Sequence, residues 1–570
     1  MTNTTNTTNT TNKIILEAKS IMAKDEPFVD GALTKEQTSA LKADAMIKQV
    51  RAKLMKYPDF PVGVLLTADQ KVEAKQLLEQ QVNIKAVTQV ELEERLKVCG
   101  FILRALNAKT GKDGIVKSVP IPEIEAARVI MGLMSIKRVG DTDNDLTPLL
   151  VYDLNKGIYR ENNIGLGKMI NLLEPRFKKA GREETKALLL QNCEYAEPTK
   201  NADLAVLGNG IYNIETKEFL PFSPEFVFLT KASVNWNPDA VCPKFEDDWT
   251  FDGFLDEQFN NNSEDKYAMY QLLQLALLTN KAKKVFVYFY SKEGRTGKGT
   301  MTELIRHLVG TENSGSANLV QIESGFGLES VYEKSFIFGN ENDSVWNTRG
   351  NDNIKNLATG DTLTIQRKGV INISASLTPL IVQSMNSTPK FNNLESAITN
   401  RMRIFEFTHS YYDDDNERVK DEYVKNQDLL EYLAYKVLTM PISGLVDTQT
   451  SKSIKNSIAF ESNHVLEYVH ERLEDFDGDT FTIAALFVDF RAWCDKSNVS
   501  CDYSRRMFSD KLIAATNETF DYDKRKRNPE MSQSDLNSIM DAINGSNMAR
   551  NIHDVSDFYN TNRQAVIVKK

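Results

Sequence analysis

The stretch from residue 284 to residue 300, KVFVYFYSKEGRTGKGT, constrains this chain more than any other. An apolar run of strand length ends abruptly in a glycine-rich loop, and a helix-like segment, MTELIRHLVG, follows. A strand, a glycine-rich loop and a helix in this order direct backbone N–H groups and the positive end of the helix at a polyphosphate. The sequence therefore predicts a nucleoside triphosphate site at this loop.

This loop differs at two positions from the pattern G-x-x-x-x-G-K-[ST]. Lys292 stands at the first glycine position, and Gly299 stands where Ser or Thr is usual, with Thr300 one residue later. The GKGT ending resembles nucleotide kinases of the adenylate kinase type and is compatible with phosphate binding. A chance glycine-rich turn is the alternative, which the flanking strand and helix disfavour. The predicted nucleotide-binding residues are Glu293, Gly294, Arg295, Thr296, Gly297, Lys298, Gly299 and Thr300.

Composition describes an ordinary globular chain. Its 570 residues suggest about three or four domains. No stretch approaches the ~18 apolar residues of a membrane span, and the N-terminus lacks an apolar signal core, so we expect a cytoplasmic protein without a membrane partner. The net charge of -10 does not exclude DNA binding, because a ring or cleft can concentrate Lys and Arg locally.

Cysteine and histidine spacing offers no metal site. The five cysteines form no C-x-x-C pair, and no His lies near any of them at ligand spacing, so neither a zinc site nor a disulfide framework is predicted. All five His follow residue 300. The acidic run 141–145 therefore lacks a His partner in the N-terminal half, and we interpret it as a solvated loop.

The pattern of helix-like and strand-like segments changes along the chain and predicts an α/β protein with several parts. We expect a hairpin turned at residues 155–157, a second hairpin turned near Thr216 and Lys217, and a helix capped by Asn280 before the glycine-rich loop. The predicted parts are a disordered polar tail (1–12), a helical N-terminal region (13–135), a mixed α+β domain (136–275), an α/β core (276–430) and a C-terminal helical or winged-helix domain (445–570).

Two further apolar strands end in polar residues. The strand at residues 336–338 precedes Asn340 and Glu341, and we expect it to neighbour the strand of the glycine-rich loop. Glu341 would then polarise an attacking water as a general base, unless this segment is only a surface loop. Asn340 occupies the position where a metal-supporting Asp is often found, so Thr300 is the better Mg²⁺ candidate of the two. Asn386 ends the strand LTPLIVQSM and could sense the γ-phosphate.

Basic residues follow in two places. Arg401 and Arg403 lie at the start of the apolar strand RIFEF. An arginine there could stabilise the charge of the transferred phosphoryl group across a subunit boundary, or it could simply lie in solvent. Arg367 and Lys368 stand at the tip of a hairpin with arms LTIQ and VINIS, after a short helix ended by Gly360. A basic hairpin tip suits contact with a phosphate backbone, although such turns are often only exposed.

The order of these motifs resembles superfamily three helicases, of the primase-helicase type found in poxviruses, bacteriophages and phage satellites. The resemblance covers about residues 145–425. It implies an AAA+-type α/β core, ATP and Mg²⁺ as cofactors, a hexameric ring with ATP between subunits, and 3′-to-5′ translocation on single-stranded DNA. It implies that Lys298 and Thr300 bind ATP·Mg²⁺, that Glu341 activates water and that Asn386 senses the γ-phosphate. Arg401, or alternatively Arg403, would act on the ATP of a neighbouring subunit. Arg367 and Lys368 would contact DNA.

The C-terminal stretch resembles the small helical or winged-helix appendages that follow such cores. There Arg505, Arg506 and the basic run 524–527 could lie against DNA, or the run could be a solvated turn. Three functions remain open: a replicative helicase that acts on single-stranded and forked DNA with further replication partners; an initiator that binds origin duplex DNA; and, least favoured, a nucleotide kinase. Because the N-terminal third shows neither a zinc ribbon nor an Asp/Asp/His set, we predict no primer synthesis.

Overall fold

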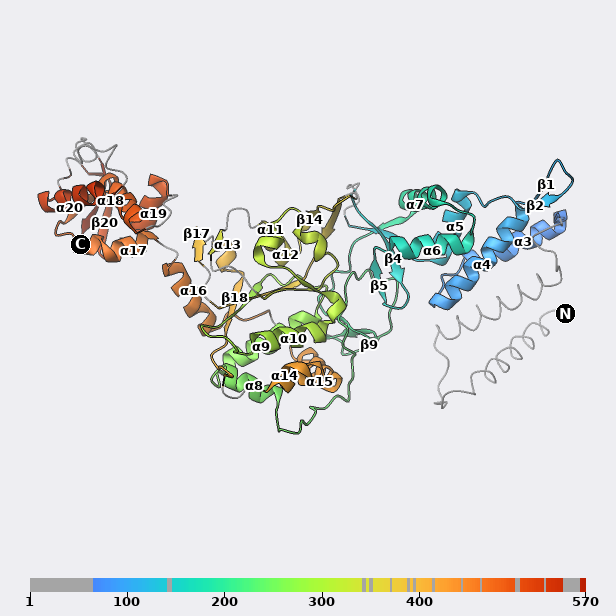
Figure 1. The fold of residues 1–570 in the computed structure, drawn as a ribbon, viewed down its shortest axis with the longest axis horizontal. Helices are drawn as coiled ribbons and strands as arrows, with labels where there is room; N and C mark the ends of the chain where they lie inside the picture. The colour runs from blue at the N-terminus through green and yellow to red at the C-terminus, as the bar shows by residue number, and fades with distance from the viewer. Residues whose placement is uncertain are drawn as a thin grey trace.

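Figure 1 shows the chain as a helical part near the N-terminus, a larger central part and a C-terminal part reached through α16. Among the helices of the described ranges, none combines the length and the apolar character of a membrane span. Predictions for residues 1–64, 141–145, Glu341 and Arg527 lie outside the described residues. The computed structural model describes residues 65–140, 146–340, 345–347, 352–369, 372–386, 390–392, 396–412, 416–441, 444–461, 464–497, 503–526, 529, 531–546 and 564–570.

Residues 65–135 and 163–192 together form a mainly helical N-terminal part. Thr67 and Thr88 begin its first two helices by accepting hydrogen bonds from N–H groups of the first turn. The apolar faces of these helices share one hydrophobic core. The elements are α3 (Ala68–Val82), α4 (Gln89–Leu106), β1 (Lys109–Thr110), β2 (Val116–Lys117), α5 (Glu123–Leu133), α6 (Asn163–Leu173) and α7 (Lys179–Asn192).

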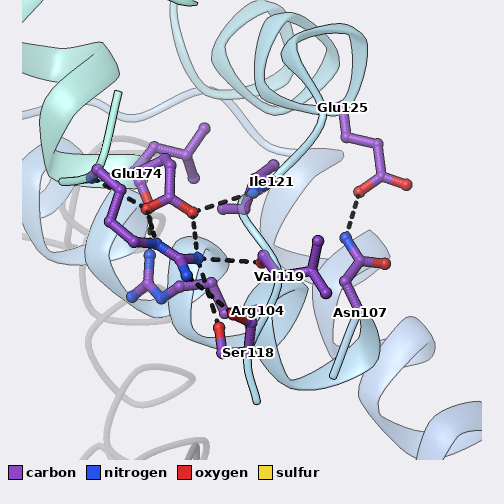
Figure 2. A network of polar contacts seen from close by, with 9 residues as sticks. Arg104, Asn107, Ser118, Val119, Ile121, Glu125 and Glu174 are labelled. Carbon is purple, nitrogen blue, oxygen red and sulfur yellow. Dashed lines mark hydrogen bonds and ion pairs between the residues drawn. The ribbon is translucent and has the colours of Figure 1, made fainter. Parts of the chain in front are cut away.

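A buried carboxylate joins separate segments of this part (Figure 2). Glu174, whose side chain is fully buried, accepts hydrogen bonds from the Arg176 guanidinium at 2.9 Å and from the Ile121 N–H at 3.0 Å. Arg176 also donates to the backbone carbonyls of Ser118 and Val119. Burial acts to raise the pKa of Glu174, but these hydrogen bonds outweigh it, so the pKa lies below its usual range.

Two small sheets lead into the central part. Both predicted hairpins are present, and their turns use the left-handed region at Gly157 (φ +71°) and Lys217 (φ +63°). The first sheet, in the order β5-β4-β3-β6, contains β3 (Ile136–Val139), β4 (Leu149–Asp153), β5 (Ile158–Arg160) and β6 (Glu194–Ala196). The second, in the order β7-β8-β9, contains β7 (Leu204–Val206), β8 (Ile211–Asn213) and β9 (Phe219–Leu220).

The central part is built on a five-stranded parallel sheet in the order β11-β12-β16-β10-β18. This confirms the predicted mixed α/β class. The helices of this part are α8 (Phe251–Gln258), α9 (Ser263–Leu277), α10 (Lys298–Val309), η1 (Thr311–Asn313), α11 (Leu319–Glu323), η2 (Gly327–Ser330), α12 (Asp352–Thr359), α13 (Ser396–Thr399), α14 (Glu417–Asp421), η3 (Tyr423–Lys425), α15 (Gln427–Thr439) and α16 (Gln449–Glu461). Its strands are β10 (Phe286–Tyr290), β11 (Ser314–Ser316), β12 (Phe336–Gly339), β13 (Val345–Asn347), β14 (Thr362–Ile365), β15 (Ile373–Ser376), β16 (Leu380–Met385), β17 (Lys390–Asn392) and β18 (Met402–Glu406).

Both faces of this sheet are buried, which explains why its strands are apolar without interruption. Along β10, Val287 and Phe289 belong to the core that contains residues of α9, α10 and α15. Phe286 and Tyr288 belong to the core on the opposite face, with residues of α11, α12 and the β14–β15 hairpin. The helices of the two cores lie on opposite sides of the strands (Figure 1).

Two local predictions are wrong. The strand that precedes Asn340, β12, does not neighbour β10, because the chain crosses over through α12 and the hairpin and inserts β16 between them. Asn280 does not cap α9, which ends at Leu277. The buried ammonium of Lys283 instead donates to the Leu278 carbonyl at 2.6 Å, so a side chain from the following segment satisfies an acceptor just beyond the helix end.

The C-terminal part packs helices against a three-stranded antiparallel sheet in the order β19-β21-β20. Its core contains Tyr468, Phe490 and Phe508, and the buried Asp489 accepts hydrogen bonds from Arg472 and Tyr468. The elements are α17 (His464–Glu471), η4 (Leu473–Asp475), β19 (Thr480–Thr482), α18 (Ile483–Lys496), α19 (Arg505–Thr516), β20 (Phe520–Lys526), α20 (Gln533–Asn544) and β21 (Gln564–Lys569).

Candidate nucleotide site

A glycine-rich loop joins β10 to α10 at the carboxyl edge of the parallel sheet, as the sequence predicts. Its last residue, Gly297, is the N-cap of α10 and has φ +78°, and no side chain caps the first turn. A Cβ at Gly297 would lie 3.0 Å from the ring of Phe254, so conformation and space both favour glycine. The positive end of α10 is therefore available to an anion at the loop.

The ammonium group of Lys298 lies among neutral side-chain oxygens. It donates hydrogen bonds to Asn386 Oδ1 at 2.9 Å, to Thr296 Oγ1 at 3.3 Å and to Ser291 Oγ. Within the described ranges no carboxylate forms an ion pair with Lys298, and burial lowers its pKa. A half-buried cation that is not neutralised is suited to receive anionic oxygens.

Residues that follow neighbouring strands share this edge with the loop. Asn386 comes directly after β16, the strand beside β10, and its exposed amide faces Lys298. Asn340 comes directly after β12, one strand further away, and is also exposed. The structure thus brings Lys298 and Asn386 into contact, while Glu341 lies outside the described residues.

Sequence reasoning missed three residues that support the loop. Ser291 is buried directly after β10, where it accepts from Lys298 and donates to the Glu293 carbonyl at 2.6 Å. A polar residue at the end of an apolar strand was the available signal. Beyond β18, Tyr411 N–H donates to the Arg295 carbonyl at 3.0 Å, and the Arg295 guanidinium lies 5.4 Å from the ring centre of Tyr412. No local pattern links this segment to the loop.

Hydroxyl groups at the start of α10 differ in their availability. Thr302 Oγ1 donates to the Lys298 carbonyl at 2.9 Å, as a helical Thr commonly does. Thr300 is half-buried at the same helix end, and its hydroxyl makes no hydrogen bond within the described ranges. Of the two, Thr300 is therefore the hydroxyl that a Mg²⁺ ion at a bound polyphosphate could use. The described residues contain no cluster of three His, Cys, Asp or Glu side chains arranged for a metal.

The two predicted arginines lie at the opposite edge of the sheet. Arg401 directly precedes β18, and its carbonyl accepts from the N–H of Phe286, the first residue of β10. The length of β10 therefore separates Arg401 from the loop, roughly 15 Å for a five-residue strand. Arg403 donates to the carbonyls of Leu445, Asn400 and Met402, and burial lowers its pKa.

The predicted basic hairpin is present as β14 and β15, but its two cations differ. Lys368 is exposed beside the turn at Gly369 (φ +74°). Arg367 is only 19% exposed and forms an ion pair with Glu161 at 3.1 Å. Glu161 follows β5 in the preceding domain. Because it is far from Arg367 in the sequence, no local pattern predicted this contact.

Family comparisons add the class of protein to this geometry. Residues 166–260 match the model described as D5 N terminal like, and residues 461–546 match the model described as Poxvirus D5 protein-like. Residues 289–401, which contain the loop, match a family of unknown function, DUF5906. These two matches, which together cover less than half of the chain, support the D5-type primase-helicase family of phages and poxviruses, and this agrees with the resemblance seen in the motifs.

Solved structures give a weaker likeness. The A form apo structure of the NrS-1 C terminal region has 15% sequence identity and a TM-score of 0.41, covering 76% of this chain and 95% of that chain. The apo structure of the NrS-1 C terminal region (305-718) has 14% identity and a TM-score of 0.42, covering 78% and 99%. These values are too low to say anything about the function of this chain. No curated protein matches its sequence.

Proposed function

We propose that this chain is an ATP-dependent replicative DNA helicase of a phage or mobile element, which moves 3′-to-5′ along single-stranded DNA as a hexameric ring. The contact of Lys298 with Asn386 at 2.9 Å, beside the uncapped end of α10, is the observation that carries the proposal. It joins a cation whose partners are all neutral, an amide and the backbone N–H groups of a helix end without a side-chain cap at one sheet edge, the set of groups that a triphosphate requires.

The residues at this edge fit ATP with Mg²⁺. Bound there, ATP would supply the phosphoanhydride bond whose hydrolysis drives movement. The backbone of residues 293–300 would hold the phosphates, and Lys298 would exchange its neutral oxygen partners for phosphate oxygens. Thr300 would offer its hydroxyl to the metal, with Asn340 as a second candidate, and Asn386 would orient around the γ-phosphate. Glu341 would accept the proton of the attacking water.

The position of Arg401 favours action between subunits. At the amino edge of the sheet it is too distant to reach a nucleotide on its own loop, but a neighbouring subunit in a ring could present its loop to this edge. An arginine supplied in this way stabilises charge in the transition state and accelerates phosphoryl transfer by about 10³–10⁵ in other enzymes. Arg403, which already donates to three carbonyls, is the weaker choice.

DNA contact is proposed for the β14–β15 hairpin. Lys368 offers an exposed cation at the tip, and Arg367 could add a second if it leaves Glu161. Such contacts to phosphates bind any sequence and weaken steeply as salt rises. They suit a protein that moves along a strand.

The test compares ATP hydrolysis by the wild type and Lys298→Ala, each with and without single-stranded DNA, over a range of salt. We expect DNA to stimulate the wild type, the stimulation to fall with salt, and Lys298→Ala to be inactive. Lys292→Ala is the matched control, because Lys292 is an exposed lysine of the same loop. Unwinding of a fork with a 3′ tail, but not of one with a 5′ tail, would support the direction. Equal activity of Lys298→Ala and the wild type would refute the site.

An origin-binding initiator is the second candidate, and the C-terminal part favours it. There α19 begins with the exposed Arg505 and Arg506 and lies beside a three-stranded sheet, an arrangement that could put a helix into a DNA groove. Full-length Arg505→Ala/Arg506→Ala should lose binding to origin duplex but keep fork unwinding. Primer synthesis is not part of the proposal, and templated incorporation of labelled ribonucleotides by the purified chain would contradict that.

A further inference from the structure

A cavity of about 760 Å³ lies at the amino edge of the parallel sheet, away from the glycine-rich loop. The preceding domain lines one side of it with residues 197–200, and the central part lines the other with residues 280–284 and the root of the β14–β15 hairpin. The two sides are in contact, since the N–H of Ser374 in the hairpin donates to the carbonyl of Leu146 in the preceding domain at 3.2 Å. The cavity is of a size that commonly holds ligands.

Most of the charges that line this cavity are already engaged. Lys200 pairs with Glu197 at 2.8 Å, and Lys334 donates to a backbone carbonyl. Glu333 accepts from the Glu161 N–H, and Asp361 accepts from the Thr359 hydroxyl. Glu333 and Asp361 thus accept from neutral donors and keep their charge, whereas Glu197 is paired with a cation.

Lys281 and Lys284 differ from the other charged residues of the lining because their ammonium groups lack protein partners among the described residues. Neither ammonium group makes a hydrogen bond or ion pair within the described part of the chain. Burial lowers the pKa of Lys281; Asp203 opposes this effect and the charge of Lys284 adds to it. The cavity lining holds four lysines against three carboxylates, so its net charge is positive, and these two lysines are the cations that an anion could pair with.

A polar track connects these lysines with the hairpin tip. Strand pairing puts Thr362 opposite Ser376 and Thr364 opposite Ser374, so these four hydroxyl side chains share one face of the hairpin. Thr362, Ser374 and Ser376 line the cavity. The intervening residues belong to the hydrophobic core on the other face. The track is roughly 13 Å long for a four-residue strand, with Lys368 beyond its far end.

We propose that Lys281 and Lys284 bind phosphates of a single DNA strand that also contacts the hairpin tip, so that the cavity is a second DNA contact at the root of the hairpin. This inference rests on the proposed function, because it takes single-stranded DNA as the ligand. Lysines at both ends and hydroxyl groups between them suit a phosphodiester backbone, which carries a charge at each nucleotide and needs no base-specific partner.

The test uses the full chain and fluorescent oligothymidines of increasing length. The variant is Lys281→Gln/Lys284→Asn, since Lys284 has φ +57° and Asn tolerates that conformation. We expect about ten-fold weaker binding of long oligomers and a slope of log affinity against log salt that is smaller by about 1.4, as two lost phosphate contacts predict. Oligomers too short to span the track should show a smaller loss.

Controls separate this inference from the proposed function. Lys281→Arg/Lys284→Arg should bind as the wild type does, and so should Lys75→Ala/Lys97→Ala, which removes two exposed lysines of α3 and α4. An unchanged affinity and salt slope in the Gln/Asn variant would overturn the inference while leaving the helicase proposal intact. A wild type that binds no single-stranded DNA would overturn both. A wild type that binds DNA through these lysines but hydrolyses no ATP would refute only the helicase.

A small anion is the competing occupant. Acetylation of Lys281 and Lys284 can be followed by mass spectrometry in the presence of oligothymidine or inorganic tripolyphosphate. Protection by the oligomer alone supports the proposed strand contact. Protection by tripolyphosphate and none by the oligomer would reassign the cavity to a small phosphate ligand and overturn the inference.

Discussion

Arg367 at the end of the β14 arm pairs with Glu161 of the preceding domain at 3.1 Å, and the two side chains are 19% and 18% exposed. The hairpin proposed to bind DNA therefore has one of its cations already neutralised by the same chain. The Glu161 N–H is held in turn by the carboxylate of Glu333 at 3.0 Å, which fixes Glu161 at this position. DNA that uses Arg367 has to displace a carboxylate that is held in place.

Removal of the Glu161 charge should strengthen DNA binding. We expect Glu161→Gln to bind oligothymidine about five-fold more tightly, because a half-buried ion pair that must break costs on the order of 1 kcal/mol. Fluorescence anisotropy gives the affinity. Glu183→Gln, which removes an exposed acid paired on α7, is the control. If Arg367→Gln gains the same increase from Glu161→Gln as the wild type does, the effect does not act through this pair.

The amide of Asn386 should matter to hydrolysis more than to binding. We expect Asn386→Ala to bind an ATP analogue nearly as the wild type does and to hydrolyse ATP about 10²-fold more slowly, the usual loss for a group that acts at the transition state. Asn386→Asp would put a carboxylate 2.9 Å from Lys298 and should weaken analogue binding at least about ten-fold. Titration with a fluorescent ATP analogue and steady-state phosphate release separate the two effects. Weaker binding by the alanine variant than by the aspartate variant contradicts this assignment.

Gly297 offers a test of the loop's shape. Gly297→Ala should lose analogue binding, because alanine at φ +78° costs about 1–3 kcal/mol and its Cβ would press on Phe254 at 3.0 Å. Gly299→Ala is the matched control, since the nearest atom to its Cβ is Lys420 Nζ at 3.8 Å. Its thermal melting should be unchanged. Equal loss of binding in both variants would show that backbone shape at Gly297 is not the cause.

The two arginines near β18 should separate stability from catalysis. Arg403→Ala removes three hydrogen bonds to carbonyls and should lower the unfolding free energy by about 2–3 kcal/mol. Arg401→Ala should reduce ATP hydrolysis with a smaller change in melting temperature. A mixture of Arg401→Ala and Lys298→Ala should hydrolyse ATP faster than the two variants do separately, because some interfaces then combine an intact loop with an intact arginine. No recovery in mixed assemblies counts against a trans role.

The sequence predicted the local features of the fold and of the site. The strand order and the contacts between distant segments depend on long-range packing, which the sequence did not predict. The loop before Lys298, the hairpin of Arg367 and the turn at Gly157 follow from glycine positions and apolar runs. The order of strands does not, because nothing in the β12 sequence indicates that β16 lies between it and β10. The Glu161–Arg367 pair joins residues 206 positions apart and leaves no periodic signal. The predicted domain boundaries stay predictions.

Glu174 links the stability of the N-terminal part to pH. Its pKa is lower when folded, so its contribution to stability is present above the unfolded pKa, roughly 4.5, and is lost as pH falls through the folded pKa. Arg176→Ala should cost about 3 kcal/mol near neutral pH, because it leaves a buried carboxylate without its ion pair. Hydrogen exchange of the α5 and α6 amides in the full chain measures the loss. The double variant Glu174→Gln/Arg176→Ala should recover part of this lost stability, and its stability should no longer fall below pH 4.5. Equal protection of these amides in Arg176→Ala and in the wild type would mean that the ion pair contributes nothing.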